Sequence, residues 1–126
     1  MKGDNVFKSY REFTLDKPVN TKRLKVRHIH DTKSKLACTI VQLHNTDVVH
    51  RVNVNNVVTL NSGGWKTPST KVTMNTAMRL IYGSIAPCIY QSKGKWYVEF
   101  NNGDIELYFD GMIIGGGCGA PFAVLN

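Results

Sequence analysis

Apolar and polar residues alternate along most of this chain with the two-residue period of β-strands. Between Lys22 and His30 basic and apolar residues alternate up to Val26, and the β-branched run 36–43 is typical of a central strand. The same character returns in the runs 47–54, 56–60, 87–91, 95–100 and 105–109. Tight turns are expected between them, for example at Asn45-Thr46-Asp47 and at Ser92-Lys93-Gly94. The pattern predicts about seven short strands, joined for the most part as a meander.

One segment alone has the period of a helix. Its apolar residues recur at i, i+3, i+4 and i+7, in Met74, Ala77, Met78 and Ile81. Thr67 is suited to cap the helix, Pro68 needs no N–H at the first position, and Gly83 can end it in the left-handed αL conformation. We predict a helix from about 68 to 82, followed by a three-stranded antiparallel sheet. The fold class is α+β, an antiparallel sheet or small barrel of about seven short strands with one helix.

The length of the chain favours one domain. At 126 residues, of which 42% are hydrophobic, it can bury a real core but is short for two domains. We expect a single domain over 1–126, with a basic N-terminal part (1–35) and a Gly-rich apolar tail (115–126). Phe122, Val124 and Leu125 are too apolar to remain in water, so the tail either docks on the body or meets a partner, such as a second copy in a homo-oligomer.

Positive charge is concentrated at the N-terminal end. The net charge is +7, and residues 1–35 hold ten Lys or Arg against four Asp or Glu. If Arg23, Lys25 and Arg27 share one strand face, their tips repeat at about 6.6 Å, close to the phosphate spacing of nucleic acid. Lys33 and Lys35 follow them. The stripe predicts nucleic-acid or acidic-protein binding; the alternatives are a solvated basic face and lysines that protect an edge strand from aggregation.

Glycines, hydroxyls and lysines gather at the predicted helix start. A helix N-terminus leaves N–H groups free, which favours an anion there. The candidate phosphate-binding residues are Trp65, Lys66, Thr67, Thr70 and Lys71. We expect Trp65 at the rim, where it can stack on a base, as exposed Tyr10 or Trp96 also can. The segment is not a Walker A loop, because it has no GK[ST] triplet, and a purely structural cap is the alternative.

The remaining chemistry-bearing residues predict neither an enzyme nor a metal site. The four histidines lack zinc-binding spacing, and no cofactor is expected. Cys38, Cys88 and Cys118 form no CxxC motif and no nucleophile signature, which is typical of reduced, mostly buried thiols in a cytosolic protein. The acids Asp104, Glu106 and Asp110 alternate as on the solvent face of a strand. We therefore expect a non-enzymatic protein.

The sequence also indicates where the protein acts. No apolar run approaches the roughly 20 residues that span a bilayer, and the first residues contain no run of signal-peptide length. We expect no membrane partner and a soluble intracellular protein.

Four motifs lie in the middle of the chain: N-T-x-V-V from Asn45, T-L-N-S-G-G-W-x-T from Thr59, Y-Q-x-K-G-x-W-Y-V from Tyr90, and F-D-G-M from Phe109. In combination they resemble a family of small bacteriophage proteins over about residues 40–112. The resemblance implies a viral origin and therefore a location in the host cytoplasm. The basic residues 1–35 and the glycine tail fall outside it and are expected to be additions of this chain.

A phage accessory protein of this size typically acts by binding. The first hypothesis is a non-enzymatic protein that binds a phosphate-bearing partner, nucleic acid above all, through the basic strand and the helix N-terminus. The alternatives are an anti-defence or replication inhibitor that binds an acidic host protein directly, and a protein that sequesters a nucleotide signal. Salt dependence separates them, because backbone binding weakens steeply with salt.

Overall fold

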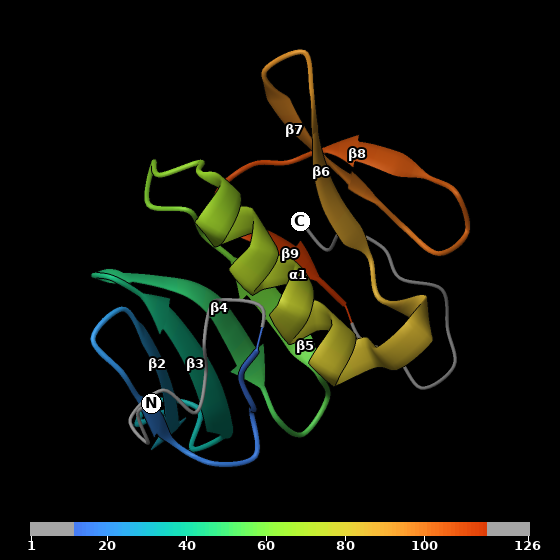
Figure 1. The fold of residues 1–126 in the computed structure, drawn as a ribbon. Coiled ribbons are helices and arrows are strands. Elements are labelled where there is room, and N and C mark those ends of the chain that lie inside the picture. The colour runs from blue at the N-terminus through green and yellow to red at the C-terminus, as the bar shows by residue number, and fades with distance from the viewer. Residues whose placement is uncertain (1–11, 116–126) are drawn as a thin grey trace.

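The computed structural model describes residues 12–115, which form two antiparallel sheets and one long helix (Figure 1). The larger sheet has the order β1-β2-β3-β4-β5-β9, with β1 (Val19–Asn20), β2 (Leu24–His30), β3 (Ala37–Leu43), β4 (Thr46–Val52), β5 (Val57–Leu60) and β9 (Met112–Ile114). The smaller has the order β6 (Cys88–Ser92), β7 (Lys95–Glu99) and β8 (Ile105–Leu107). Helix α1 (Pro68–Tyr82) is followed by the short 3-10 helix η2 (Gly83–Ile85). The α+β class is confirmed, and neither sheet closes into a barrel within residues 12–115.

The larger sheet is a meander that a distant strand completes. Strands β1 to β5 follow one another in chain order, each antiparallel to the next, and β9 then pairs with β5 from the far end of the described chain. Helix α1 contacts β3 and β4 on one side and β6 on the other, so it lies between the two sheets (Figure 1). Strands β1 and β9 were not predicted, because two or three residues are too few to show a period.

Helix α1 has the predicted bounds and the predicted cap. The side chain of Thr67 accepts the N–H of Thr70, and Pro68 occupies the first turn. Met74, Ala77 and Met78 are fully buried, and Ile81 packs against the core. Gly83 has the expected positive φ of +71°, but its ψ of −140° lies outside the αL region, because the chain continues into η2.

The turn between β3 and β4 differs from the predicted one. Leu43 pairs with Thr46, so the turn consists of His44 and Asn45, and Thr46 and Asp47 belong to β4. A β-bulge then shifts the register opposite Val41 and Gln42. The bulge lets two consecutive residues, Val48 and Val49, both be buried, which strict alternation does not allow.

One core joins the two sheets and the helix. It includes Leu60 and Met112 from the larger sheet, Met74 from α1, and Trp96 and Val98 from the smaller sheet. The smaller sheet is also attached by polar contacts. Asn75 of α1 donates to the carbonyl of Ile89 (2.9 Å) and accepts its N–H (2.8 Å), so a helix side chain occupies the outer backbone groups of edge strand β6.

The cysteines do not all lie in the core. Cys38 is buried, and burial raises the pKa of its thiol. Cys88 is exposed, contrary to the prediction of mostly buried thiols, because it starts β6 on the outer face, opposite Glu99. Cys118, Tyr10 and the predicted docking of the tail lie outside the described residues.

Residues 12–115 contain neither a candidate membrane span nor a candidate metal cluster. No helix there is long and apolar enough to cross a membrane. No three side chains of His, Cys, Asp or Glu in that part of the chain are placed to hold a metal ion.

Candidate ligand pocket at the helix start

A pocket of about 360 Å³ lies where three segments meet: the β3–β4 turn, the first turn of α1, and the loop between β5 and α1. This loop contains Gly63 and Gly64 and is called the glycine loop below. Its lining residues are Leu43, His44, Asn45, Thr46, Val48, Ser62, Trp65, Thr67, Ser69 and Thr70. Five of these ten carry a hydroxyl group, while Leu43 and Val48 give it an apolar part. Small-molecule sites commonly have volumes of about 300–1,000 Å³ and combine an apolar surface with a few polar groups, so this hollow has the size and chemistry of a binding site.

The glycine loop forms one wall because it approaches β4 very closely. Gly63 has a φ of +62°, and a Cβ added there would lie 2.7 Å from Oγ1 of Thr46. Both facts require glycine. The loop is further fixed by Asn61, whose side chain accepts the Gly63 N–H (2.8 Å), and by the Ser62 hydroxyl, which accepts the Gly64 N–H (3.2 Å).

Asp110 fixes the same loop through hydrogen bonds to Ser62. Its Oδ1 accepts the N–H of Ser62 (2.8 Å), the hydroxyl of Ser62 (2.7 Å) and the hydroxyl of Tyr108 (2.7 Å). Burial raises the pKa of Asp110, but the hydrogen bonds from Tyr108, Ser62 and Gly64 outweigh it and hold that pKa below its ordinary value. Burial and the nearby carboxylate raise the pKa of Tyr108. Asp110 is exposed to solvent, as predicted, but it does not lie on a strand, because β8 ends at Leu107 and the chain turns back to the loop.

Three hydroxyls are connected at the first turn of α1. Oγ1 of Thr67 accepts the Thr70 N–H (3.3 Å) and lies 3.0 Å from Oγ1 of Thr70 and 3.2 Å from Oγ of Ser69. All three residues line the pocket. Each hydroxyl has one O–H, and the two contacts between hydroxyls use two of the three, so one O–H can turn toward a ligand oxygen without loss of these contacts.

Trp65 lies at the pocket with 68% of its surface exposed, as predicted for a residue at the rim. The lysines are placed differently. Nζ of Lys66 lies 5.8 Å from the ring centroid of Tyr108, at cation–π distance, and neither Lys66 nor Lys71 lines the pocket. The pocket therefore contains the predicted aromatic and hydroxyl groups without the predicted cations.

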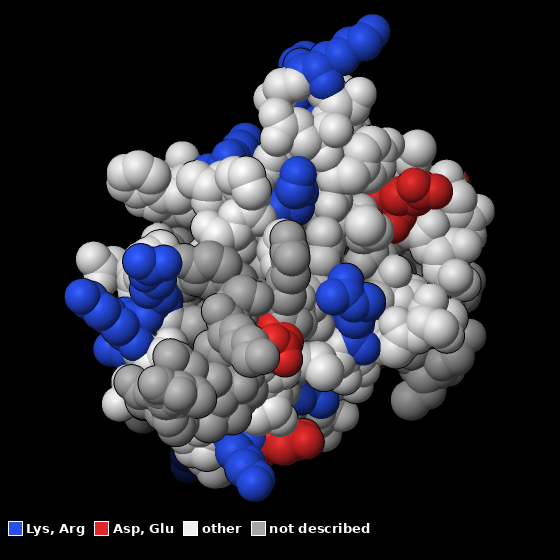
Figure 2. Space-filling view, in the orientation of Figure 1, with Lys and Arg blue, Asp and Glu red and all other residues white. Residues whose placement is uncertain are grey.

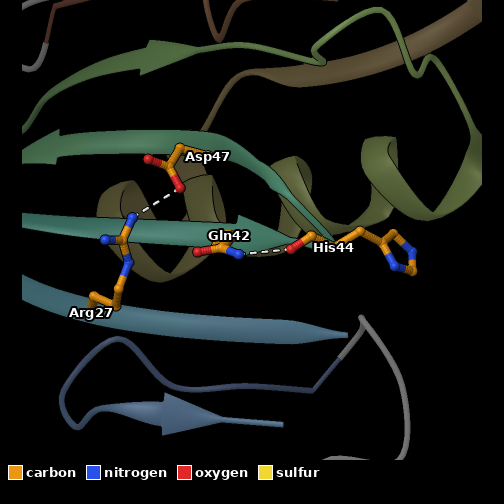
Figure 3. A network of polar contacts seen from close by, with 4 residues as sticks. All are labelled: Arg27, Gln42, His44 and Asp47. Atoms are coloured by element: carbon orange, nitrogen blue, oxygen red, sulfur yellow. Dashed lines mark hydrogen bonds and ion pairs between the residues drawn. The ribbon is translucent and has the colours of Figure 1, made fainter. Parts of the chain in front are cut away.

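The basic stripe lies on the outer face of β2, and its member Arg27 forms an ion pair. Leu24 and Val26 are buried, so Arg23, Lys25 and Arg27 lie on the opposite face. Arg27 reaches across β3 to Asp47 of β4, with 2.9 Å between Nη2 and Oδ1 (Figure 3). Both side chains are about half exposed, at 45% and 52%. A carboxylate thus lies within the stripe.

The start of the stripe is next to the pocket. The N–H of His44, a lining residue, donates to the carbonyl of Arg23 (2.7 Å). The side-chain amide of Gln42, in β3, donates to the carbonyl of His44 (Figure 3). Lys33 and Lys35 lie in the β2–β3 loop at the other end of β2, about 20 Å along the strand. On the face in Figure 2, Lys and Arg side chains occur at several separate places rather than in one patch.

The structure therefore divides the predicted site residues into groups. The pocket is lined by Trp65, Thr67 and Thr70. The outer face of β2 carries Arg23, Lys25 and Arg27. The remaining four lysines lie apart from both the pocket and this face: Lys33, Lys35, Lys66 and Lys71. Sequence reasoning missed the wall made by the β3–β4 hairpin, which includes His44 and Thr46. The one available signal was the double glycine, which often marks a close backbone approach.

The fold and the pocket define a small α+β protein in which a helix start, a glycine loop and a hairpin turn enclose one hollow. The family model described as Kyanoviridae Gp96 protein matches residues 11–115, and the chain belongs to this family of phage proteins. The resemblance to small bacteriophage proteins is confirmed. The match also includes the basic residues from 11 to 35, so these are not additions of this chain, as we had expected. No curated protein and no solved structure matches the chain.

Proposed function

We propose that this protein is a non-enzymatic phage accessory protein that binds single-stranded nucleic acid in the host cytoplasm. The observation that carries the proposal is the exposed Trp65 beside a hydroxyl-lined pocket at a helix N-terminus. In this arrangement a nucleotide at the pocket places its phosphate against the hydroxyls and its base on the indole ring.

The pocket supplies contacts that suit a phosphate and a base together. One hydroxyl of the Thr67, Ser69 and Thr70 cluster can donate to a phosphate oxygen, and the positive end of the helix dipole favours an anion there. Stacking of a base on an aromatic side chain contributes about 1–3 kcal/mol and does not depend on base identity. These contacts favour a ligand that carries both groups.

The stripe supplies the charge that the pocket lacks. Arg23 is bonded through its carbonyl to the pocket turn, and Lys25 and Arg27 continue along the same face. A strand that leaves the pocket along β2 meets these cations through its backbone, without contacts to base edges. Binding is therefore expected to be insensitive to sequence and to weaken with salt.

A fluorescence titration tests this proposal. The chain has two tryptophans, and Trp96 is buried at 3% exposure, so a Trp96→Phe background leaves Trp65 as the reporter. We expect a short single-stranded oligonucleotide to change the Trp65 emission at low salt, and the change to require more ligand at higher salt. An Arg23→Gln/Lys25→Gln variant should bind more weakly, with the slope of log affinity against log salt reduced by about two. Before titration, the Trp65 emission of this variant should equal that of the parent chain, which is the control for correct folding.

Other outcomes distinguish the alternatives. In one outcome, a free nucleotide changes the Trp65 emission as much as the oligonucleotide does, and the Arg23→Gln/Lys25→Gln change leaves that response unaffected. This outcome supports sequestration of a nucleotide signal in the same pocket. No response to either ligand at low salt contradicts the proposal. The inhibitor hypothesis then remains, and a host protein whose binding is insensitive to salt would support it.

A further inference from the structure

The outer face of the smaller sheet is apolar at its centre and is left uncovered by the described residues. Ile105 is 51% exposed and Leu107 is 55% exposed, both on β8. Tyr90 of β6 and Tyr97 of β7 stack with their ring centroids 5.8 Å apart. The opposite face packs into the core through Ile89, Trp96 and Val98. The sheet thus packs one face into the core through Ile89, Trp96 and Val98 and presents an aromatic and aliphatic second face.

The strand register arranges this outer face in three rows. Tyr90, Tyr97 and Leu107 are direct neighbours across the three strands and form the central, apolar row. Cys88, Glu99 and Ile105 form the row on one side. Ser92 and Lys95 form the row on the other side. Along β7 the face therefore reads Lys95, Tyr97, Glu99: a cation, an aromatic ring and an anion.

The charges at the two ends of this face are unpaired within the described chain. Lys95 and Glu99 are both exposed, and neither forms an ion pair with another residue of 12–115. They are four residues apart on one strand, about 13 Å, which is too far for them to pair with each other. Figure 2 shows basic side chains at the tip of the β6–β7 hairpin and acidic side chains over the β7–β8 hairpin.

We propose that this face is the interface of a symmetric dimer with a second copy of the chain. In a two-fold dimer every contact occurs twice, because the same patch faces itself. A two-fold axis that lies in the interface and is perpendicular to β7 at Tyr97 reverses the strand direction, so Lys95 of each copy faces Glu99 of the other. The tyrosine row and Leu107 of each copy then cover each other. Charge complementarity of the face with itself is the reason to choose a second copy over a different partner.

Charge reversal at the two ends tests this pairing. We expect the full chain to sediment as a dimer at micromolar concentration. Lys95→Glu and Glu99→Lys each place like charges together twice, so each should raise the dimer Kd roughly tenfold or more. The double variant Lys95→Glu/Glu99→Lys exchanges the two charges and should restore the dimer. Glu106→Lys is the matched control, because Glu106 is exposed on β8 but lies opposite Val98, in register with the other face.

A mixing experiment separates the proposal from misfolding. The Lys95→Glu chain carries two acids on the face and the Glu99→Lys chain carries two cations, so an equimolar mixture should form a heterodimer that neither forms as a homodimer. Leu107→Asn should weaken the dimer at every salt concentration. A full chain that is monomeric at about 100 μM would overturn the proposal. The face would then have another occupant, either residues 116–126 or a different protein. A dimer unaffected by all four face variants would overturn it too.

Discussion

Arg27 donates a hydrogen bond to Asp47 across the intervening strand β3, with 2.9 Å between Nη2 and Oδ1. An exposed ion pair of this kind contributes about 0–1 kcal/mol, so it stabilises the fold little. Its effect on an anionic ligand is larger, because a phosphate that approaches Arg27 must compete with a carboxylate already in place. The ion pair therefore weakens the attraction of the basic stripe for an anionic ligand.

Asp47→Asn is expected to strengthen nucleic-acid binding. The change removes the competing charge and leaves Arg27 available to a phosphate. The slope of log affinity against log salt should become steeper by about one, while the free energy of unfolding changes by less than about 1 kcal/mol. Asp104→Asn removes an equal charge in the distant β7–β8 turn and is the control. If both variants strengthen binding equally, Arg27 is not part of the binding surface.

Gly63→Ala is expected to destabilise the protein by about 1–3 kcal/mol. The new Cβ would lie 2.7 Å from Oγ1 and 2.8 Å from Cγ2 of Thr46, and the φ of +62° adds strain. Gly64→Ala is the matched comparison, because its φ is also positive but nothing lies within 4 Å of the added carbon. Urea denaturation of both variants measures the difference. Thr46→Ala removes both close atoms and should restore part of the loss, with non-additive free energies in the double variant.

Thr67→Ala is expected to cost on the order of 1 kcal/mol of stability, because the Thr70 N–H loses its acceptor at the helix N-terminus. Thr67→Ser keeps the hydroxyl and should retain most of the stability. Chemical denaturation followed by circular dichroism gives both values. Equal stability of the alanine variant and the native chain would show that the cap has no energetic role.

Stability should fall in acid partly through Asp110. The native pKa of this group is below its ordinary value of 3.8, so its carboxylate form favours the folded state. That contribution is fully present above the ordinary value and is lost as the pH falls through the lowered native pKa. Asp110→Asn keeps an oxygen that can accept from Ser62 and Tyr108 but cannot titrate. Thermal unfolding between pH 6 and roughly pH 2 should therefore show a smaller decline for the variant than for the native chain. Parallel curves would assign the acid sensitivity to other groups.

The features predicted from sequence are those that nearby residues determine. Helix α1 has its cap, its first proline and its final glycine within the helix or next to it, and its bounds were predicted correctly. Strand β3 was located to within one residue for the same reason, since its β-branched run is continuous. Local composition contains this information because caps, turns and periods depend on neighbours in the chain.

The features that were missed depend on contacts between distant segments. The pairing of β9 with β5 brings together residues about 55 positions apart, and the pocket needs the β3–β4 hairpin to meet the helix start. The direction of Lys66 depends on Tyr108, and the partner of Arg27 lies two strands away. No periodic pattern records such contacts. Even with most elements predicted, four of the ten predicted site residues lie apart from both the pocket and the stripe.

The contact between Asn75 and Ile89 has a consequence for aggregation. The smaller sheet has two edges, and an open edge can recruit a strand from another chain through its free backbone groups. At β6 the amide of Asn75 already occupies the N–H and C=O of Ile89 that such a strand would need. A helix side chain thus blocks unwanted growth of the sheet at that edge, and leaves β8 as the side from which the sheet could be extended.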